Sequence, residues 1–143
     1  MYIKELVEGQ RMKLAIYQHN ITKAYTDRLQ EVGPEGDLGE HELNWKITRD
    51  VAFWGSESWE PMMASKYKMV GEMEVTDMSE VFHIGNGYGD QTKLNRTDDM
   101  RSLSVGDLVE DVETGELFMC DPEGWTSINY MGLQAPHQFG EVA

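Results

Sequence analysis

The chain has 143 residues, enough for one domain and too few for two independent cores of ordinary size. Its 26 acidic and 12 basic residues give a net charge of −14, and a negative field of this size repels nucleic-acid phosphates, so the sequence disfavours direct DNA or RNA binding. A single cysteine, Cys120, excludes an internal disulfide and a metal site built from several thiolates.

The chain carries no signal for a membrane. No apolar run reaches the ~18 residues of a membrane-spanning helix. The N-terminal residues MYIKELVEGQ lack the apolar centre of a secretory signal, and we assign residues 1–11 to an N-terminal arm. We therefore expect a cytoplasmic protein that makes no membrane contact.

The first expected elements are a strand and a helix. The run MKLAIYQH, Met12–His19, has successive apolar residues and is typical of a strand that is buried on both faces, although its pattern also fits a helix. Asn20 is expected to cap a helix over residues 21–32, in which apolar residues recur at helical spacing. Gly33 and Pro34 are expected to end this helix.

The middle of the chain is expected to hold two further strands and a short helix. Apolar residues alternate over residues 45–53, which predicts a strand. The segment YKMVGEMEV, Tyr67–Val75, predicts another strand. Asp77 and Glu80 have the spacing of a capping box, which opens a short helix that Gly85 ends.

Residues 101–130 are expected to form a ribbon of short strands joined by tight turns. Gly115 supplies the positive φ of the first turn, and Pro122 with Gly124 makes the second. The remaining residues, 131–143, are assigned to an irregular tail. The expected strands of the ribbon cover residues 103–112, 117–121 and 125–130.

These elements predict a single α+β domain. Its sheet is expected to be mixed or mostly antiparallel, with about five strands. The main helix, residues 21–32, is expected to pack on one face of the sheet, together with the short helix that follows Asp77.

Five segments of the chain follow one another in a recognisable order: KLAIYQ, a helix ending in RLQEVG, YKMVGEMEVTDMSEVFHIGN, RSLSVGDLV and DPEGW. In this order they resemble the YodL-like domain family. The resemblance covers residues 12–130 and is sharpest over residues 102–109 and 121–125. It implies a small domain found in bacteria, their phages and mobile elements, and it supplies no catalytic residues.

The sequence lacks the motifs that are typical of metal sites, phosphate-binding loops and reactive thiols. Cys120 lies among acidic neighbours, which raise the pKa of a thiol, so we interpret it as a small apolar strand residue. His41 is flanked by Glu40 and Glu42, but the four histidines lack ligand spacing, and we predict neither a metal nor a cofactor. The glycine-rich loop at residues 85–90 lacks the lysine that follows a phosphate cradle.

The aspartates near the ribbon form no fixed acid–base pair. Asp98, Asp99 and Asp107 could serve as general acid and base, but nothing in their spacing sets the separation. Asp107 follows Gly106 and is expected to bond backbone amides where a strand begins. We therefore predict that the protein is not an enzyme; an enzyme would need a pocket that gathers at least two titratable groups.

The favoured function is protein binding. Acidic residues steer a protein toward a basic partner, and tryptophan side chains anchor the complex. We expect a phage or mobile-element protein that binds a host protein with a basic surface in the host cytoplasm and inhibits or modulates it. The expected acidic contributors are Glu35, Asp37, Glu40, Glu42, Asp98, Asp99, Glu110, Asp111 and Glu113. The candidate anchors are Trp54, Trp59 and Trp125.

Two alternatives remain open from the sequence. One is a structural or assembly subunit, either a homo-oligomer or a virion-associated protein. The other is a DNA mimic that inhibits a nucleic-acid-binding protein through its negative charge. Within the ribbon, the acidic hairpin over residues 110–116 is the expected working surface.

Overall fold

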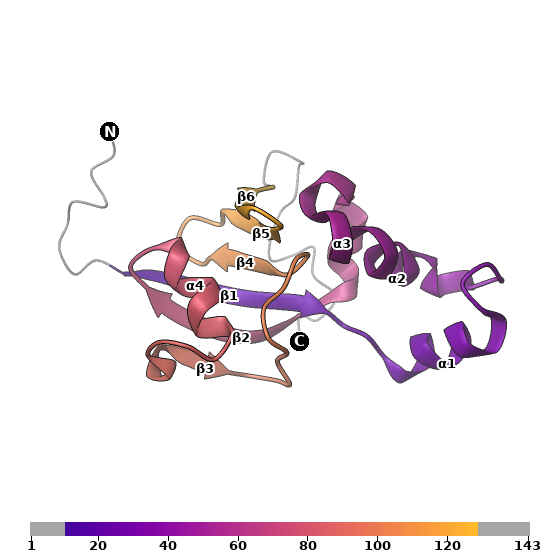
Figure 1. Cartoon of the computed structure of the whole chain (residues 1–143), viewed down its shortest axis with the longest axis horizontal. Helices are drawn as coiled ribbons and strands as arrows, with labels where there is room; N and C mark the ends of the chain where they lie inside the picture. The colour runs from indigo at the N-terminus through magenta and orange to yellow at the C-terminus, as the bar shows by residue number, and fades with distance from the viewer. Residues whose placement is uncertain (1–10, 129–143) are drawn as a thin grey trace.

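The computed structural model describes residues 11–128, so the tail and all but the last residue of the N-terminal arm lie outside the described part. The described chain forms a six-stranded sheet with helical segments on both faces (Figure 1). All neighbouring strands are antiparallel, in the order β3-β2-β1-β4-β5-β6. The strands are β1 (Met12–His19), β2 (Tyr67–Val75), β3 (Leu94–Arg96), β4 (Leu108–Asp111), β5 (Leu117–Asp121) and β6 (Gly124–Ser127). The predicted single α+β domain is confirmed, with six strands where about five were expected.

The central strand β1 is buried on both faces, as its apolar run predicted. Leu14 and Ile16 point into one core cluster, whereas Ala15 and Tyr17 point into the other. This alternation follows from the two-residue period of a strand. Strand β1 pairs with β2 on one side and with β4 on the other, so it holds the two halves of the sheet together.

A helical segment covers one face of the sheet where the sequence predicted a strand. It comprises α2 (Glu42–Lys46), a π-helical turn (Ile47–Val51) and α3 (Ala52–Trp54). The strand predicted over residues 45–53 is wrong: the segment is helical, and Ile47 and Val51, one helical turn apart, both pack against Leu108 and Met119 of the sheet. Two 3-10 helices, Gly55–Ser58 and Pro61–Lys66, complete this layer.

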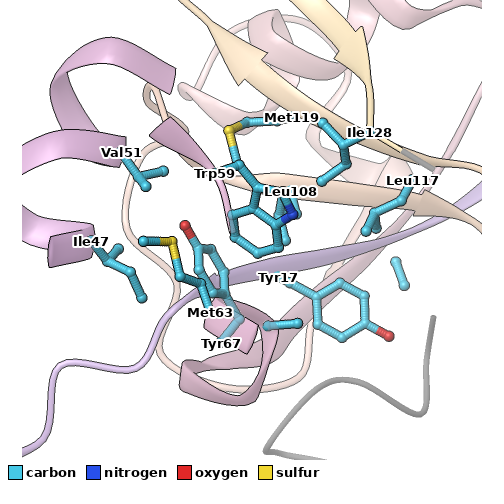
Figure 2. Close-up of a cluster of buried hydrophobic side chains, with 12 residues drawn as sticks. Tyr17, Ile47, Val51, Trp59, Met63, Tyr67, Leu108, Leu117, Met119 and Ile128 are labelled. Atoms are coloured by element: carbon cyan, nitrogen blue, oxygen red, sulfur yellow. The ribbon is translucent and has the colours of Figure 1, made fainter. Parts of the chain in front are cut away.

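The core under this layer is rich in aromatic and sulfur-containing side chains. Figure 2 shows Trp59 beside Leu108 and Met119 of the sheet, with Tyr67 close by. The rings of Trp59 and Tyr67 meet edge to face, with centroids 5.5 Å apart.

Helix α4 (Met78–Gly85) packs on the opposite face, where it crosses β1 and β2 (Figure 1). Asp77 is its N-cap and accepts a hydrogen bond from the Ser79 backbone, as predicted. The Glu80 carboxylate accepts a hydrogen bond from the Thr76 backbone N–H (3.1 Å). In a capping box it would accept from the N-cap backbone, that of Asp77, so the predicted capping box is shifted by one residue. Two short 3-10 helices, Gly39–His41 and Gln91–Lys93, lie in the connections.

Helix α1 (Lys23–Val32) lies beyond the end of β1 and away from the sheet (Figure 1). Its N-cap is Thr22 and not Asn20, whereas Gly33 ends it with positive φ as predicted. Tyr25 is the one buried residue of this helix. The prediction that this helix packs on one face of the sheet is therefore wrong: it lies beyond the sheet, with Tyr25 buried and Leu29 and Val32 half-buried.

The ribbon forms two antiparallel hairpins, as predicted. Gly115 has φ of 80° in the first turn and Gly124 has φ of 126° in the second. The first strand begins at Leu108 because residues 103–107 form an irregular connection in which Gly106 has φ of 96°. Strand β6 ends at Ser127, and residues 129–130 of the predicted strand lie outside the described residues.

Within residues 11–128, no helix is both long enough and apolar enough to cross a membrane.

Candidate functional site

A groove of about 390 Å³ lies between the 3-10 helix Gly55–Ser58 and the turn that joins β5 to β6. Helical and strand segments that are far apart in the sequence thus form its two sides. The volume falls within the ~300–1,000 Å³ range typical of ligand pockets, near its lower end. The described residues that line it are Trp54, Ser56, Glu57, Asp121, Pro122, Glu123, Gly124, Trp125 and Thr126.

Asp121 holds the two sides of this groove together. Its carboxylate accepts hydrogen bonds from the backbone N–H of Ser56 (2.6 Å) and from the Ser56 hydroxyl (2.6 Å). It also accepts one from the Thr126 hydroxyl (2.5 Å) on β6. Gly55 permits this approach because a Cβ atom there would lie 2.0 Å from Asp121 Oδ1. The groove is therefore built by one carboxylate that joins segments 65 residues apart.

Two tryptophans line the groove. Trp54 is 54% exposed, although its ring packs edge to face on Phe53 with centroids 4.8 Å apart. Phe53 is exposed as well, so the pair forms an apolar rim that no described residue covers. Trp125 is half-buried and packs against the core cluster beneath α4. The groove thus presents one exposed indole ring, that of Trp54, and one that is partly buried against the core, that of Trp125.

The charged side chains that line the groove are all acidic. Glu57, Asp121 and Glu123 contribute three carboxylates, and no basic side chain occurs among the described residues of the lining. Glu57 and Glu123 are exposed, and neither side chain has a hydrogen bond or ion pair within residues 11–128. Their charges are therefore available to a cation that enters the groove.

Three predicted surface residues are instead structural. Trp59 is only 3% exposed, because the helical layer folds its ring into the core. Glu110 is buried beside Ala15 of β1, where it accepts a hydrogen bond from the Tyr17 hydroxyl (3.2 Å) and where burial raises its pKa. Asp111 is also buried, and it accepts the Glu113 backbone N–H (3.0 Å) in the hairpin turn. The expected working surface over residues 110–116 thus loses two of its acids to the fold.

The remaining predicted acids are exposed but do not form one surface. The loop between α1 and α2 and the β4–β5 hairpin lie at opposite ends of the molecule (Figure 1). Asp37 accepts the Gly39 backbone N–H (3.0 Å), and Asp98 pairs with Lys68 (3.3 Å). The acids of the α1–α2 region are Glu35, Asp37, Glu40 and Glu42; those elsewhere are Asp98, Asp99 and Glu113.

The thiol of Cys120 lies in β5 and is buried, as expected for an apolar strand residue. Burial raises its pKa to about 11, with further contributions from the charges of Asp107 and Asp121. Among the described residues, no group of three or more His, Cys, Asp and Glu side chains is arranged to hold a metal ion.

A second and smaller pocket lies at the C-terminal end of β1, where it brings together four titratable side chains. Its volume is about 160 Å³. Asp107 accepts the Ser104 backbone N–H (2.9 Å) there, as its position before a strand predicted. Burial raises the pKa of Asp107 to about 6, and burial lowers the pKa of His19. The gathered side chains are His19, Tyr67, Arg101 and Asp107.

Sequence reasoning found two of the residues in the acidic groove and missed the others. Trp54 and Trp125 were candidate anchors, and the groove brings both into its lining. Glu57 and Glu123 were not predicted as site residues, because the sequence does not reveal that the segment at residues 55–58 and the turn at residues 121–124 lie side by side. The residues Asp121 and Pro122 predict the turn of a hairpin, but the neighbouring sequence does not indicate that the Asp121 carboxylate accepts a hydrogen bond from Ser56.

Comparisons with protein-family models, with curated protein sequences and with solved structures find no match to this chain. The resemblance to the YodL-like family therefore stays a prediction, and the function is argued from the geometry.

Proposed function

We propose that the protein binds a basic segment of another protein in the acidic groove between Gly55–Ser58 and the β5–β6 turn. One observation carries this proposal: the described lining combines two tryptophans with three carboxylates and contains no basic side chain. A lysine ammonium or an arginine guanidinium is attracted both to the face of an indole ring and to a carboxylate. A groove with both features favours a cationic side chain over an acidic or neutral one.

The residues of the groove have different tasks in this proposal. The Asp121 carboxylate is already engaged by Ser56 and Thr126, so it positions the groove. Glu57 and Glu123 have no described partner and would pair with the incoming cation. Trp54 would supply most of the apolar contact area, because more than half of its surface is exposed before binding.

The net charge of −14 extends the attraction beyond the groove. A field of this sign raises the association rate with a basic partner, and salt screens it over a Debye length of about 8 Å at physiological ionic strength. Binding is therefore expected to weaken strongly as salt is raised.

As part of the same proposal, we place the protein in a phage or a mobile element, where it inhibits or modulates a host protein. The support for this setting is the resemblance of residues 12–130 to the YodL-like family together with the acidic charge. The proposed mechanism is occlusion of a basic surface that the host protein uses for another interaction.

A capture experiment with variants tests the proposal. Tagged wild-type protein, Trp54→Ala and Phe82→Ala are exposed to a bacterial host lysate, and bound proteins are identified by mass spectrometry. Phe82 is the matched control, because it is an exposed aromatic residue on α4, outside the groove. We expect one basic protein to be retained by wild type and Phe82→Ala and to be lost from Trp54→Ala.

Two results would count against the groove. Equal capture by wild type and Trp54→Ala would place the binding surface elsewhere. Capture of no protein, together with self-association in light scattering, would favour the structural or assembly subunit.

A further inference from the structure

The small pocket at the C-terminal end of β1 has a polar floor that the proposed protein-binding function does not use. His19, Tyr67 and Asp107 form this floor, and all three are buried, with exposures of 6%, 1% and 4%. Exposed residues, among them Arg101 and Ile21, surround the opening. Buried polar groups at the base of a pocket are costly unless they are paired, so the partners of each one define what the pocket can accept.

The hydrogen bonds of His19 leave one ring nitrogen as an acceptor. Its Nε2 lies 2.8 Å from Asn44 Oδ1, and Asn44 Nδ2 lies 3.3 Å from His41 Nδ1. Because an amide oxygen only accepts, His19 Nε2 carries the proton and His19 Nδ1 has a free lone pair. Within residues 11–128, His19 Nδ1 has no hydrogen-bond partner, and it keeps some exposure to solvent. Burial, aided by the charge of Arg101 and opposed by the hydrogen bond to Asn44, lowers the pKa of His19 and so favours the neutral ring.

Asp107 offers a second acceptor. Its Oδ2 accepts hydrogen bonds from the Ser104 backbone (2.9 Å) and from Gln18 Nε2 (3.0 Å), whereas Oδ1 has no partner in the described chain. Tyr67 offers none, because its hydroxyl donates to the Gly106 carbonyl at 2.6 Å. The floor thus presents two acceptors, one on a carboxylate and one on a neutral imidazole.

Arg101 supplies the opposite charge at the opening. Its Nη2 donates to the His19 carbonyl (3.3 Å), and the other guanidinium N–H groups have no described partner. Its charge acts on the pKa of His19, Tyr67 and Asp107, which places it within electrostatic reach of the whole floor. One guanidinium and one carboxylate give the pocket a formal charge near zero, with Asp107 buried and Arg101 exposed.

We propose that this pocket binds a small zwitterion, a free α-amino acid with a short side chain. Its ammonium group would donate to Asp107 Oδ1 and His19 Nδ1, and its carboxylate would accept from the guanidinium of Arg101. The apolar side chains of Ile21 and Ile47 in the lining would contact a short alkyl group.

The size of the pocket agrees with this ligand class. At about 30 Å³ per water molecule, a volume of 160 Å³ corresponds to about five waters. Glycine, alanine and serine contain a similar number of non-hydrogen atoms, whereas an aromatic amino acid contains far more. The pocket therefore selects by charge at two points and by size.

Titration of the ¹⁵N-labelled full chain with L-alanine tests the proposal, with ethylamine and propionate as probes that carry only one of the two charges. We expect saturable shifts of the Ser104, Val105 and Gly106 amides with alanine at a dissociation constant in the ~1 mM range. Ethylamine and propionate are expected to bind at least about tenfold more weakly. No saturable shift with glycine, alanine or serine up to about 50 mM, or equal responses to alanine and propionate, would overturn the proposal.

Variants separate binding from folding. Arg101→Gln removes the proposed carboxylate contact at an exposed position, and Arg96→Gln on β3 is the matched control outside the pocket. We expect alanine affinity to fall at least about tenfold in Arg101→Gln and to stay unchanged in Arg96→Gln. Unchanged alanine binding in Arg101→Gln, with an amide spectrum that otherwise matches wild type, would refute the assigned contact.

Discussion

Replacing Asp121 with alanine should loosen the acidic groove and destabilise the whole domain. The carboxylate accepts three hydrogen bonds, from the Ser56 backbone, the Ser56 hydroxyl and the Thr126 hydroxyl. It is partly exposed, so water can replace some of what is lost, and each bond is worth roughly 1 kcal/mol net. The sum gives an expected loss of about 3 kcal/mol in the free energy of unfolding.

Urea unfolding followed by circular dichroism measures this loss. For a slope of ~2 kcal/mol per molar urea, a loss of about 3 kcal/mol lowers the midpoint by roughly 1.5 M. Glu123→Ala is the matched control, because Glu123 lies in the same turn, is exposed and has no described partner. The control should remain within about 0.5 kcal/mol of wild type.

The variant Asp121→Asn refines the test. The asparagine oxygen can still accept the Ser56 backbone N–H, but its amide nitrogen cannot accept from the hydroxyls of Ser56 and Thr126. Its stability should fall between wild type and Asp121→Ala. If Asp121→Ala proves as stable as Glu123→Ala, the carboxylate does not hold the groove together and the reasoning fails.

Three further predictions concern the core and its titratable groups. Gly55→Ala should lower the free energy of unfolding in urea by at least ~2 kcal/mol, because φ is positive and the new Cβ would lie 2.0 Å from Asp121 Oδ1. The control Gly87→Ala also has positive φ but has open space around the new Cβ, and it should lower the free energy of unfolding by only about 1 kcal/mol. Burial raises the folded-state pKa of Asp107 from 3.8 to about 6, so its stabilising contribution is complete below pH 3.8 and is lost as the pH rises through 6. The stability of Asp107→Asn relative to wild type should therefore improve by up to about 3 kcal/mol from pH 4 to pH 7, and a constant difference would contradict the assignment. Burial raises the pKa of the Cys120 thiol from 9.0 to about 11, which lowers the fraction of reactive thiolate at pH 8. The thiol should therefore react with dithionitrobenzoate at pH 8 at least about 100-fold more slowly in the folded than in the unfolded chain. Equal rates would show that the thiol is accessible in the folded chain.

Much of the sheet could be predicted from local patterns. The bounds of β1 and β2 match the predicted strands, because the continuous apolar run of β1 and the alternating pattern of β2 both favour a strand. The turns at Gly115 and Gly124 were predicted because only particular residues adopt their backbone angles. Asp77 likewise identified the start of α4.

The helical layer over residues 42–58 shows where the pattern was ambiguous. Ile47 and Val51 fit both an alternating and a helical spacing, and Trp45 and Phe53 extended the alternation in the sequence, although the Phe53 side chain proves to be exposed. The packing decided between them, since a helix at this position covers the apolar face that Leu108 and Met119 present.

Neither pocket could be assembled from the sequence. The acidic groove depends on the bond between Ser56 and Asp121, which are 65 residues apart. The small pocket joins the end of β1, the π-helical turn, the start of β2 and the connection before β4. Such sites follow from tertiary packing, and no spacing within one segment encodes them.

The most direct test of the central claim is a map of the surface that the basic partner covers. Hydrogen exchange of the full chain is measured by mass spectrometry with and without the partner identified by capture. The account predicts slower exchange in residues 53–57 and 121–126, on the two sides of the acidic groove. Protection of the hairpin at residues 111–116 or of the loop at residues 34–42, with no change in the groove, would contradict it.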